Sequence, residues 1–223
     1  MRERFVGLMS GTSVDGVDAV IAVFDGARFA AVEASLHLPH PKELRQQLIT
    51  LGRDAHAAIE LRSLAALDVA VAEQFAVVTR SLLKKANLHA AHIRAIGSHG
   101  QTIFHDPTGV RSSIQVGDPN HIAALTGITV VADFRRMDIA LGGEGAPLVP
   151  AFHQAVFASA QATAVVNIGG IANVTLLSDE APTLGFDCGP GNALMDEWIG
   201  RQQGHAYDAN GGFAAQGRVI PGL

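Results

Sequence analysis

The spacing of apolar positions changes several times along the chain, and each change predicts a new element. Apolar runs between Gly, Pro, Asp or Asn predict strands, whereas apolar residues at every third or fourth position predict helices. Strands are expected over 5–9, 17–24, 28–36, 93–100, 113–116 and 128–134, as a strand pair over 163–177, and as a short strand from 184. Helices are expected over roughly 42–51, then 58–86 and 119–126, over about 148–158, and from near Pro190 to 200. Strands that alternate with helices predict an α/β fold.

Two connecting segments carry particular signals. Asp118 is expected to cap the helix over 119–126, because it precedes a proline at the first helical position. The segment DIALGGEGAPL, residues 138–148, is rich in glycine and is expected to be a loop.

The turn between the first two strands is polar and contains glycine. It reads SGTSVD from Ser10 to Asp15, and Asp15-Gly16 is a dipeptide typical of a hairpin turn. One interpretation is an ordinary hairpin whose Ser and Thr favour the turn. The other is an anion-binding loop, because hydroxyls, backbone N–H groups and the carboxylates of Asp15 and Asp18 suit phosphates and Mg²⁺. A P-loop is not expected, since that motif needs a lysine after its glycines and the first lysine is Lys42.

A second hairpin is expected at NIGGIAN, from Asn167 to Asn173. It repeats the order of the first hairpin: an apolar run, a turn of small and polar residues, and another apolar run. Asn167 and Asn173 are either turn residues alone or nucleotide contacts. Two such hairpins, separated by helices, are typical of kinases that bind a nucleotide between two lobes. The pattern therefore predicts a duplicated, two-lobed α/β fold with an interlobe cleft.

Composition narrows the class of protein. The 223 residues are 48% apolar and 17% charged, which is typical of a globular protein. The formal net charge of -5 argues against nucleic acid or an anionic membrane as the main partner. The single cysteine, Cys188, excludes an intramolecular disulfide and a cysteine-rich metal site. Because the sequence also shows no signal peptide and no bilayer-spanning apolar stretch, a cytoplasmic protein is expected.

Five motif-bearing segments occur in order along nearly the whole chain. They are GLMSGTSVDGVD (7–18), GSHGQTIFHDP (97–107), DFRRMDIALGGEGAPLVPAFH (133–153), VVNIGGIANVT (165–175) and GFDCGPGNALMDEW (185–198). Together they resemble the anhydro-N-acetylmuramic acid kinase family. The resemblance implies the two-lobed, actin-like ATPase (ribonuclease H-like) fold of the sugar kinase, Hsp70 and actin superfamily. The first lobe is expected over 1–145 and the start of the second over 146–223, with the second lobe incomplete at its C-terminus.

The resemblance implies an ATP-dependent kinase of peptidoglycan recycling, and also a homodimer. The family converts 1,6-anhydro-N-acetylmuramic acid and water to N-acetylmuramic acid 6-phosphate. A carboxylate that deprotonates the water suits this chemistry, as in an inverting glycosidase, and the released O6 then attacks the γ-phosphorus. The family motif assigns that base to Asp187. The alternative for Asp187, from local sequence, is the cap of the helix that begins near Pro190.

The other candidate residues come from the same motifs. ATP is expected to contact Gly11, Thr12, Ser13, Val14, Asp15, Gly16, Val17 and Asp18 in the first hairpin and Asn167, Gly169 and Gly170 in the second; Mg²⁺ is expected at Asp15 and Asp18. The sugar is expected to contact His99, Gln101, Arg135 and Glu144. His99, Gln101 and His105 belong to the segment SHGQTIFHDP at the end of the expected strand, and strand-end loops hold ligands in α/β folds.

Alternatives stay open for the sugar site and for the function. A hydrogen bond within its own loop is the alternative role for His99. The guanidinium of Arg135 or Arg136 suits bidentate binding of a carboxylate, and the alternative is an exposed ion pair with Asp133 or Asp138. For the function, the second hypothesis is a non-catalytic nucleotide-binding or regulatory module of the same superfamily. A simple ATPase is the third.

Overall fold

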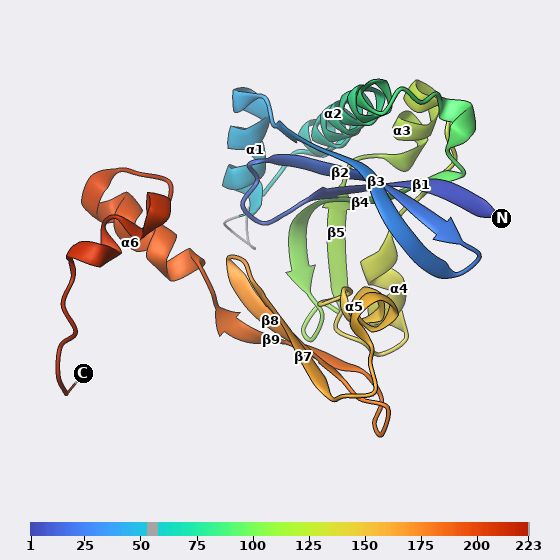
Figure 1. Ribbon diagram of the computed structural model, residues 1–223. Helices are drawn as coiled ribbons and strands as arrows, with labels where there is room; N and C mark the ends of the chain where they lie inside the picture. Colours follow the sequence, from blue (N-terminus) through green and yellow to red (C-terminus); the bar gives the residue numbers. More distant parts are fainter. Residues whose placement is uncertain (53–57, 223) are drawn as a thin grey trace. The chain divides into compact units, whose positions relative to one another are not determined.

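The computed structural model describes residues 1–52 and 58–222. The chain divides into two compact units, residues 1–148 and residues 149–223 (Figure 1). Both units contain strands and helices, so the predicted α/β class is confirmed.

A mixed sheet forms the centre of the first unit. Its strands are β1 (Arg2–Ser10), β2 (Gly16–Asp25), β3 (Arg28–Pro39), β4 (Ala95–Asp106), β5 (Ser112–Val116) and β6 (Val130–Val131). The strand order is β3-β2-β1-β4-β5, and β6 pairs with β4. The pairs β1–β4 and β4–β6 are parallel, whereas β1–β2, β2–β3 and β4–β5 are antiparallel. The parallel pair β1–β4 joins the N-terminal hairpin to the rest of the sheet.

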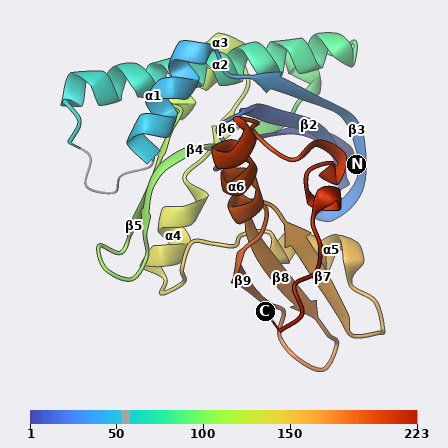
Figure 2. The ribbon, with the colours of Figure 1, turned by 90° about the vertical axis from the view of Figure 1, so that its left-hand side faces the viewer.

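Helix α2 supplies much of the core of the first unit. The described helices of this unit are α1 (Lys42–Gly52), α2 (Leu61–Lys85), α3 (Pro119–Thr126), α4 (Phe134–Ala140) and the 3₁₀ turn η1 (Ala90–His92). Figures 1 and 2 both show α2 and α3 on the same side of the sheet. Four apolar side chains of α2, three or four residues apart, are fully buried: Val71, Phe75, Val78 and Leu82. One face of α2 therefore packs on the sheet, as its spacing predicted.

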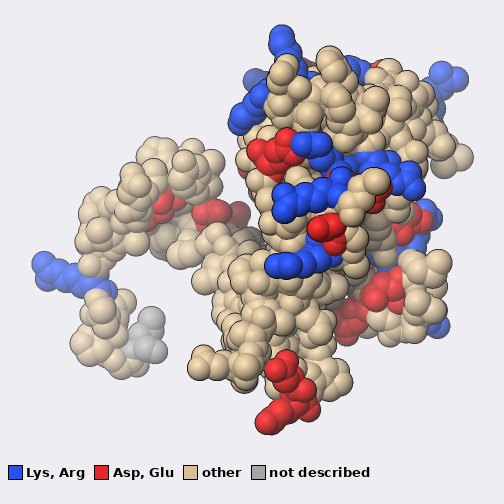
Figure 3. All heavy atoms as spheres, turned by 45° about the vertical axis from the view of Figure 1, so that its right-hand side comes forward, with Lys and Arg blue, Asp and Glu red and all other residues tan. Residues whose placement is uncertain are grey.

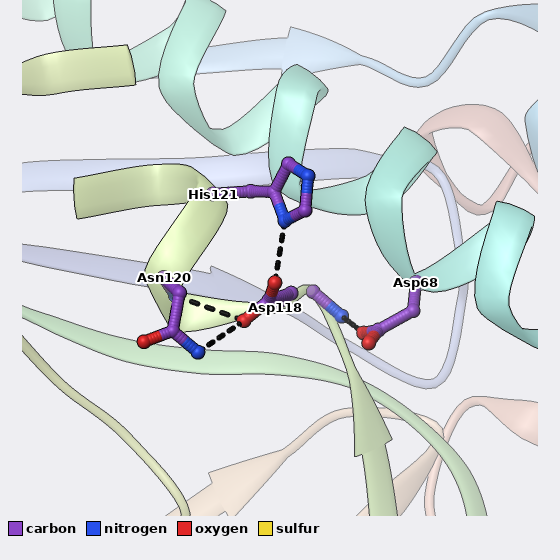
Figure 4. A network of polar contacts seen from close by, with 5 residues as sticks. Asp68, Asp118, Asn120 and His121 are labelled. Carbon is purple, nitrogen blue, oxygen red and sulfur yellow. Dashed lines mark hydrogen bonds and ion pairs between the residues drawn. The ribbon is translucent and has the colours of Figure 1, made fainter. Parts of the chain in front are cut away.

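The connection from β5 to α3 is fixed by two carboxylates (Figure 4). Asp118 accepts hydrogen bonds from the backbone N–H of Asn120 at 2.9 Å and from His121 Nδ1. This confirms the predicted cap of α3. The bond from His121, above all, lowers the pKa of the Asp118 carboxyl. On α2, Asp68 Oδ1 accepts the N–H of Gly117 at 2.6 Å, so the same short segment is tied to both helices.

Charged side chains of both signs lie near one another on the face of the first unit that Figure 3 shows. Arg4 pairs with Glu33 at 2.6 Å, and Arg94 lies 3.4 Å from Glu3. These pairs are solvent-exposed, so each contributes little to stability.

The second unit is a three-stranded antiparallel sheet with two α-helices among its described residues. Its elements are α5 (Pro150–Phe157), β7 (Thr163–Ile168), β8 (Ile171–Leu177), β9 (Leu184–Pro190), α6 (Ala193–Gln203), η2 (Ala209–Gly211) and η3 (Ala214–Gln216). The strand order is β7-β8-β9. The buried His153 of α5 forms a 2.8 Å hydrogen bond with Thr175 of β8, which holds α5 against the sheet. In the described parts of both units, no helix has the length and apolar character needed to cross a membrane.

Two expectations about strand ends in the first unit are wrong. The strand expected over 93–100 continues as β4 to Asp106, because its second half pairs with β5. Gln101 and His105, expected just past the strand, therefore lie on it together with His99. The strand expected over 128–134 is reduced to the two residues of β6. Asp133 adopts a left-handed conformation with φ of 64° and ends the extended segment, and α4 takes up the start of the expected glycine-rich loop.

Two turn expectations are also corrected. Asp15-Gly16 is not a two-residue hairpin turn, since Gly16 already belongs to β2 and the left-handed residue is Val14, with φ of 50°. The last helix does not begin at Pro190, because β9 extends through that residue and α6 begins at Ala193. Its N-cap position is Asn192, so the cap role considered for Asp187 is wrong.

Candidate functional site

The loop between β1 and β2 presents polar groups to solvent and anchors itself in the core. Thr12, Ser13 and Asp15 are exposed, whereas Val14 is 7% exposed and belongs to the hydrophobic core. The N–H of Val14 donates to the carbonyl of Gly11 at 3.1 Å, which closes the loop as a turn. The left-handed Val14 thus turns its side chain inward while its neighbours face water. The hydroxyls of Thr12 and Ser13 therefore lie on the solvent side of the turn.

Only a glycine fits at position 16. A Cβ there would lie 2.3 Å from the carbonyl oxygen of Leu38 and 2.8 Å from the ring of His37. The close approach brings the start of β2 directly onto β3. At Gly11, in contrast, a Cβ would meet no atom within 4 Å. Packing therefore explains why position 16 is a glycine, but it does not explain the glycine at position 11.

Asp15 and Asp18 are the carboxylates predicted to hold Mg²⁺. Ser13 Oγ donates to Asp15 Oδ1 at 2.6 Å, and this bond is the main cause of a lowered Asp15 pKa. Asp18, on β2, lies 3.0 Å from His37 Nδ1 and is largely exposed. Among the described residues, no three His, Cys, Asp or Glu side chains are placed to hold a metal by themselves. Two carboxylates nevertheless fit Mg²⁺, which takes its remaining ligands from nucleotide phosphates and water.

His99 and Arg135 are in direct contact. Arg135 donates from Nε to His99 Nε2 at 2.8 Å and from Nη1 to the carbonyl of Gly145 at 2.5 Å. His99 Nδ1 lies 2.8 Å from the carbonyl of Gly100, so the neutral ring carries its proton on Nδ1 and accepts at Nε2. Burial is the main cause of a lowered His99 pKa. The Gly100 hydrogen bond opposes this effect in part, and the charge of Arg135 adds a smaller lowering. A neutral histidine thus orients a cationic side chain.

The predicted ion pair belongs to the neighbouring arginine. Arg136 pairs with Asp133 at 2.6 Å, on the exposed surface. Asp138 has another role, because its Oδ2 accepts the N–H of Gly145 at 2.7 Å and fixes the loop that Arg135 also binds. Glu144, next to Gly145, is exposed. His99, Arg135 and the loop that contains Glu144 are therefore close together. Their contact with a sugar stays a prediction.

Gln101 is buried, and its amide is bonded within the protein. It is 2% exposed, donates to the carbonyls of Gly11 and Thr102, and accepts from Ser10. Its contact with a sugar stays a prediction. Ser10 also contacts His40, a residue that the sequence offered no reason to select. The prolines on both sides of His40 predict only a break between two elements. No local pattern predicts that the His40 side chain bonds to a residue of another strand.

In the second unit, three candidate residues form a row across the sheet. Asn167 of β7 pairs with Asn173 of β8, and Asn173 pairs with Asp187 of β9. Directly opposed residues of antiparallel strands point to the same face, with Cβ atoms about 5 Å apart. Asp187 is exposed, and Asn173 Oδ1 is buried without a partner among the described residues.

The Gly-Gly turn of the second hairpin is held by the start of α6. The N–H of Gly191 donates to the carbonyl of Gly170 at 2.9 Å, and the N–H of Asn192 donates to that of Gly169 at 2.7 Å. The segment that follows Asp187 therefore fixes the turn predicted to contact a nucleotide. Whether Asn167, Gly169 and Gly170 contact one stays a prediction.

The chain is similar to one protein family and to several solved structures. The family model described as anhydro-N-acetylmuramic acid kinase matches residues 3–223. Among solved structures, the Ppx/GppA family member of Aquifex aeolicus matches at 9% identity and a TM-score of 0.42, over 88% of this chain and 54% of that one. The ethanolamine utilization protein EutJ of Carboxydothermus hydrogenoformans matches at 14% identity and a TM-score of 0.35, over 91% and 57%. The chain spans about half the length of these structures.

The two glycines of the first loop give a matched test. We expect Gly16→Ala to lower the free energy of unfolding by about 1–3 kcal/mol, because its Cβ would collide with backbone that cannot move aside easily. Gly11→Ala should stay within about 0.5 kcal/mol of the wild type, since the position is open. Urea denaturation of the two variants measures both values. Equal effects of the two substitutions would contradict this account of the loop.

The His99–Arg135 contact predicts a pH dependence of stability. A histidine whose pKa is lower in the folded than in the unfolded state binds fewer protons when the protein is folded. Its contribution to the free energy of unfolding is therefore complete above about pH 6.5, the unfolded-state pKa. This contribution is lost as the pH falls through the folded-state pKa. We expect His99→Gln to reduce this loss, because Gln Oε1 accepts from Arg135 without titrating. Denaturation midpoints between about pH 7.5 and about pH 5 measure the slope.

A control for this titration is Thr79→Val, which removes a buried hydrogen bond of α2 but no titratable group. It should keep the slope of the wild type. If His99→Gln also keeps that slope, His99 does not hold Arg135 as a neutral acceptor.

Proposed function

Because the chain belongs to the anhydro-N-acetylmuramic acid kinase family, we propose that it acts in the conversion of 1,6-anhydro-N-acetylmuramic acid and water to N-acetylmuramic acid 6-phosphate at the expense of ATP. The observation that carries this proposal is the family match over residues 3–223. The reaction would belong to peptidoglycan recycling in the cytoplasm, with a homodimer as the working form.

The loop over 11–15 and the start of β2 suit the phosphates of ATP. Exposed hydroxyls and a closed turn offer hydrogen-bond donors, and the chain has no P-loop lysine to supply a charge. Asp15 and Asp18 would hold Mg²⁺, which neutralises charge on the phosphates when it is bound. Phosphoryl transfer depends mainly on such positioning and charge stabilisation. In the second unit, the hairpin with Asn167, Gly169 and Gly170 would supply further nucleotide contacts.

Asp187 is proposed as the general base. Asp187 is exposed in the middle of β9 and does not cap α6, whose N-cap is Asn192. Its carboxylate is therefore accessible to a water molecule. In the proposed reaction, Asp187 takes a proton from water as the water oxygen bonds to C1 of the sugar. The bond from C1 to the bridging O6 breaks, and O6 forms the new bond to the γ-phosphorus while ADP leaves. No separate acid is needed, because O6 is transferred to phosphorus instead of being protonated.

Arg135 is proposed to bind the carboxylate of the sugar's lactyl group. A guanidinium binds a carboxylate strongly when it is held in one orientation, and His99 and Gly145 provide that orientation. Glu144 and Gln101 complete the predicted sugar contacts. The carboxylate of Glu144 suits hydroxyl or amide groups of the sugar, because it accepts hydrogen bonds.

The full protein, supplied with MgATP, the anhydro sugar and ¹⁸O-water, tests the proposal directly. We expect a sugar 6-phosphate that carries one ¹⁸O atom, because water oxygen enters at C1 and the phosphate oxygen comes from the bridge. Mass spectrometry of the product measures the label. A protein that binds MgATP but forms no sugar phosphate would instead support the non-catalytic nucleotide-binding module, and ADP release without sugar would support a simple ATPase.

Replacing the proposed base separates chemistry from binding. We expect Asp187→Asn to lower kcat by about 10²–10⁴-fold, the usual contribution of a general base, while the Kd for MgATP changes less than about twofold. Asp179→Asn, at an exposed position after β8, is the matched control and should retain wild-type values. Equal loss of ATP binding in a folded Asp187→Asn protein would argue against the role of base.

A further inference from the structure

Three buried polar side chains adjoin the 11–15 loop. Ser10 is 1% exposed, Gln101 is 2% exposed and His40 is 6% exposed. They come from three separate segments: the end of β1, the middle of β4 and the residue that follows β3. Burying polar side chains costs free energy unless they are hydrogen-bonded. A cluster of this kind next to a proposed ligand loop therefore calls for a functional explanation.

The hydrogen bonds of the cluster form a chain of donors and acceptors that leads from His40 to Gly11. Ser10 Oγ donates to Gln101 Oε1 at 2.5 Å, so it must accept from His40 Nε2, which lies 2.9 Å away. The ring of His40 thus carries its proton on Nε2. Gln101 Nε2 in turn donates to the carbonyl of Gly11 at 3.3 Å. The series from His40 through Ser10 and Gln101 ends on the first residue of the loop.

The same histidine also holds the other end of the loop. The backbone N–H of His40 donates to the carbonyl of Asp15 at 3.2 Å. His40 is therefore bonded to Asp15 directly and to Gly11 through two side chains. Between these two points lie the exposed Thr12 and Ser13, whose groups face solvent. The loop is short, so fixing both ends restricts the positions of the groups between them.

A bulge in β4 brings Gln101 into this cluster. Alternate positions of β4 are buried up to Gly100, and Gln101 then breaks the alternation by being buried as well. At the same place the register between β1 and β4 shifts, which sets Ser10 opposite Gln101. Gly100 has φ of +73°, and a Cβ there would lie 2.6 Å from the carbonyl of Val116. The extra residue turns the Gln101 side chain toward the loop.

We propose that Gln101, and His40 acting through Ser10, are positioning residues of the nucleotide site that hold the 11–15 loop in its phosphate-binding shape. This inference rests on the proposed role of that loop in ATP binding. The hydrophobic core alone would fix Val14, but not the carbonyls of Gly11 and Asp15 at the two ends. The Gln101 amide supplies the constraint at Gly11, and the backbone N–H of His40 supplies the one at Asp15.

Two substitutions of His40 isolate the side-chain bond. His40→Leu removes the Nε2 donor but keeps the backbone N–H that bonds to Asp15, and His40→Gln replaces the donor with an amide N–H. We expect His40→Leu to raise the Kd for MgATP by about five- to tenfold, the scale of one buried hydrogen bond, and His40→Gln to restore it to within about twofold. Calorimetry on the full protein measures the Kd. The KM for ATP should follow the Kd.

A second measurement needs no nucleotide. Amide hydrogen exchange over residues 11–15 should be faster in His40→Leu than in the wild type and return toward the wild-type rate in His40→Gln. Thr79→Val is the control, because Thr79 is fully buried in α2 and donates to the carbonyl of Phe75 at 2.8 Å. It loses a buried hydrogen bond away from the loop and should change neither the exchange nor the Kd.

The outcomes distinguish this inference from the proposed function. Unchanged exchange in His40→Leu, or an equal change in Thr79→Val, overturns the inference. Faster exchange with an unchanged Kd for MgATP overturns the role in the nucleotide site. A wild-type protein that binds no MgATP refutes the proposed function and with it the nucleotide part of the inference, whereas the exchange data still decide whether His40 holds the loop.

Discussion

The parallel pairing of β1 with β4 is the constraint on which the first unit depends. Ser10 and Gln101 are 91 positions apart in the chain and lie opposite each other in this pair. Parallel strands cannot be joined by a tight hairpin, so the intervening chain must cross over the sheet. That crossover contains α2, whose apolar face covers the sheet and forms the core. The pairing thus produces both the hydrophobic core and the meeting of Ser10 with Gln101.

Hydrogen bonds to backbone carbonyls recur at each candidate site. Gln101 bonds the carbonyl of Gly11, Arg135 bonds that of Gly145, and the start of α6 bonds those of the Gly-Gly turn. In each case a polar group fixes a glycine-containing loop, where few side chains are present to do so by packing. Such loops lose much conformational entropy on folding. Specific polar contacts therefore replace hydrophobic packing as the source of order at these positions.

Features set by local chemistry could be predicted from the sequence. The periodic apolar residues of α2 and the Asp118-Pro119 cap of α3 depend on neighbours a few positions away, and both predictions are confirmed. The second half of β4 was missed, because it is stabilised by pairing with β5. Helix α4 was missed because the left-handed Asp133, a conformation that its residue type does not reveal, ends the preceding strand.

In the candidate sites too, local motifs select residues, whereas the contacts between residues depend on elements far apart in the sequence. The motifs were sufficient to select His99, Arg135 and Asp187, but not to show which atoms meet. The contact of Arg135 with His99 and the pairing of Asp187 with Asn173 depend on elements far apart in the sequence. His40 was not selected at all, because its partners Ser10 and Asp15 lie far away in the sequence and local spacing does not indicate them.

The bulge at Gly100 also bears on how this chain can vary in length. Before the bulge, residues at even-numbered positions of β4 face the core, and Gln101 joins them only because one extra residue is present. Removing a single residue here would exchange the two faces of the strand beyond it, placing Thr102 where Gln101 now lies. An insertion of the same size in the β2–β3 connection, where Gly26 has open space around it, would leave every buried side chain in place. Length variation among related chains should therefore be confined to such connections and absent near Gly100.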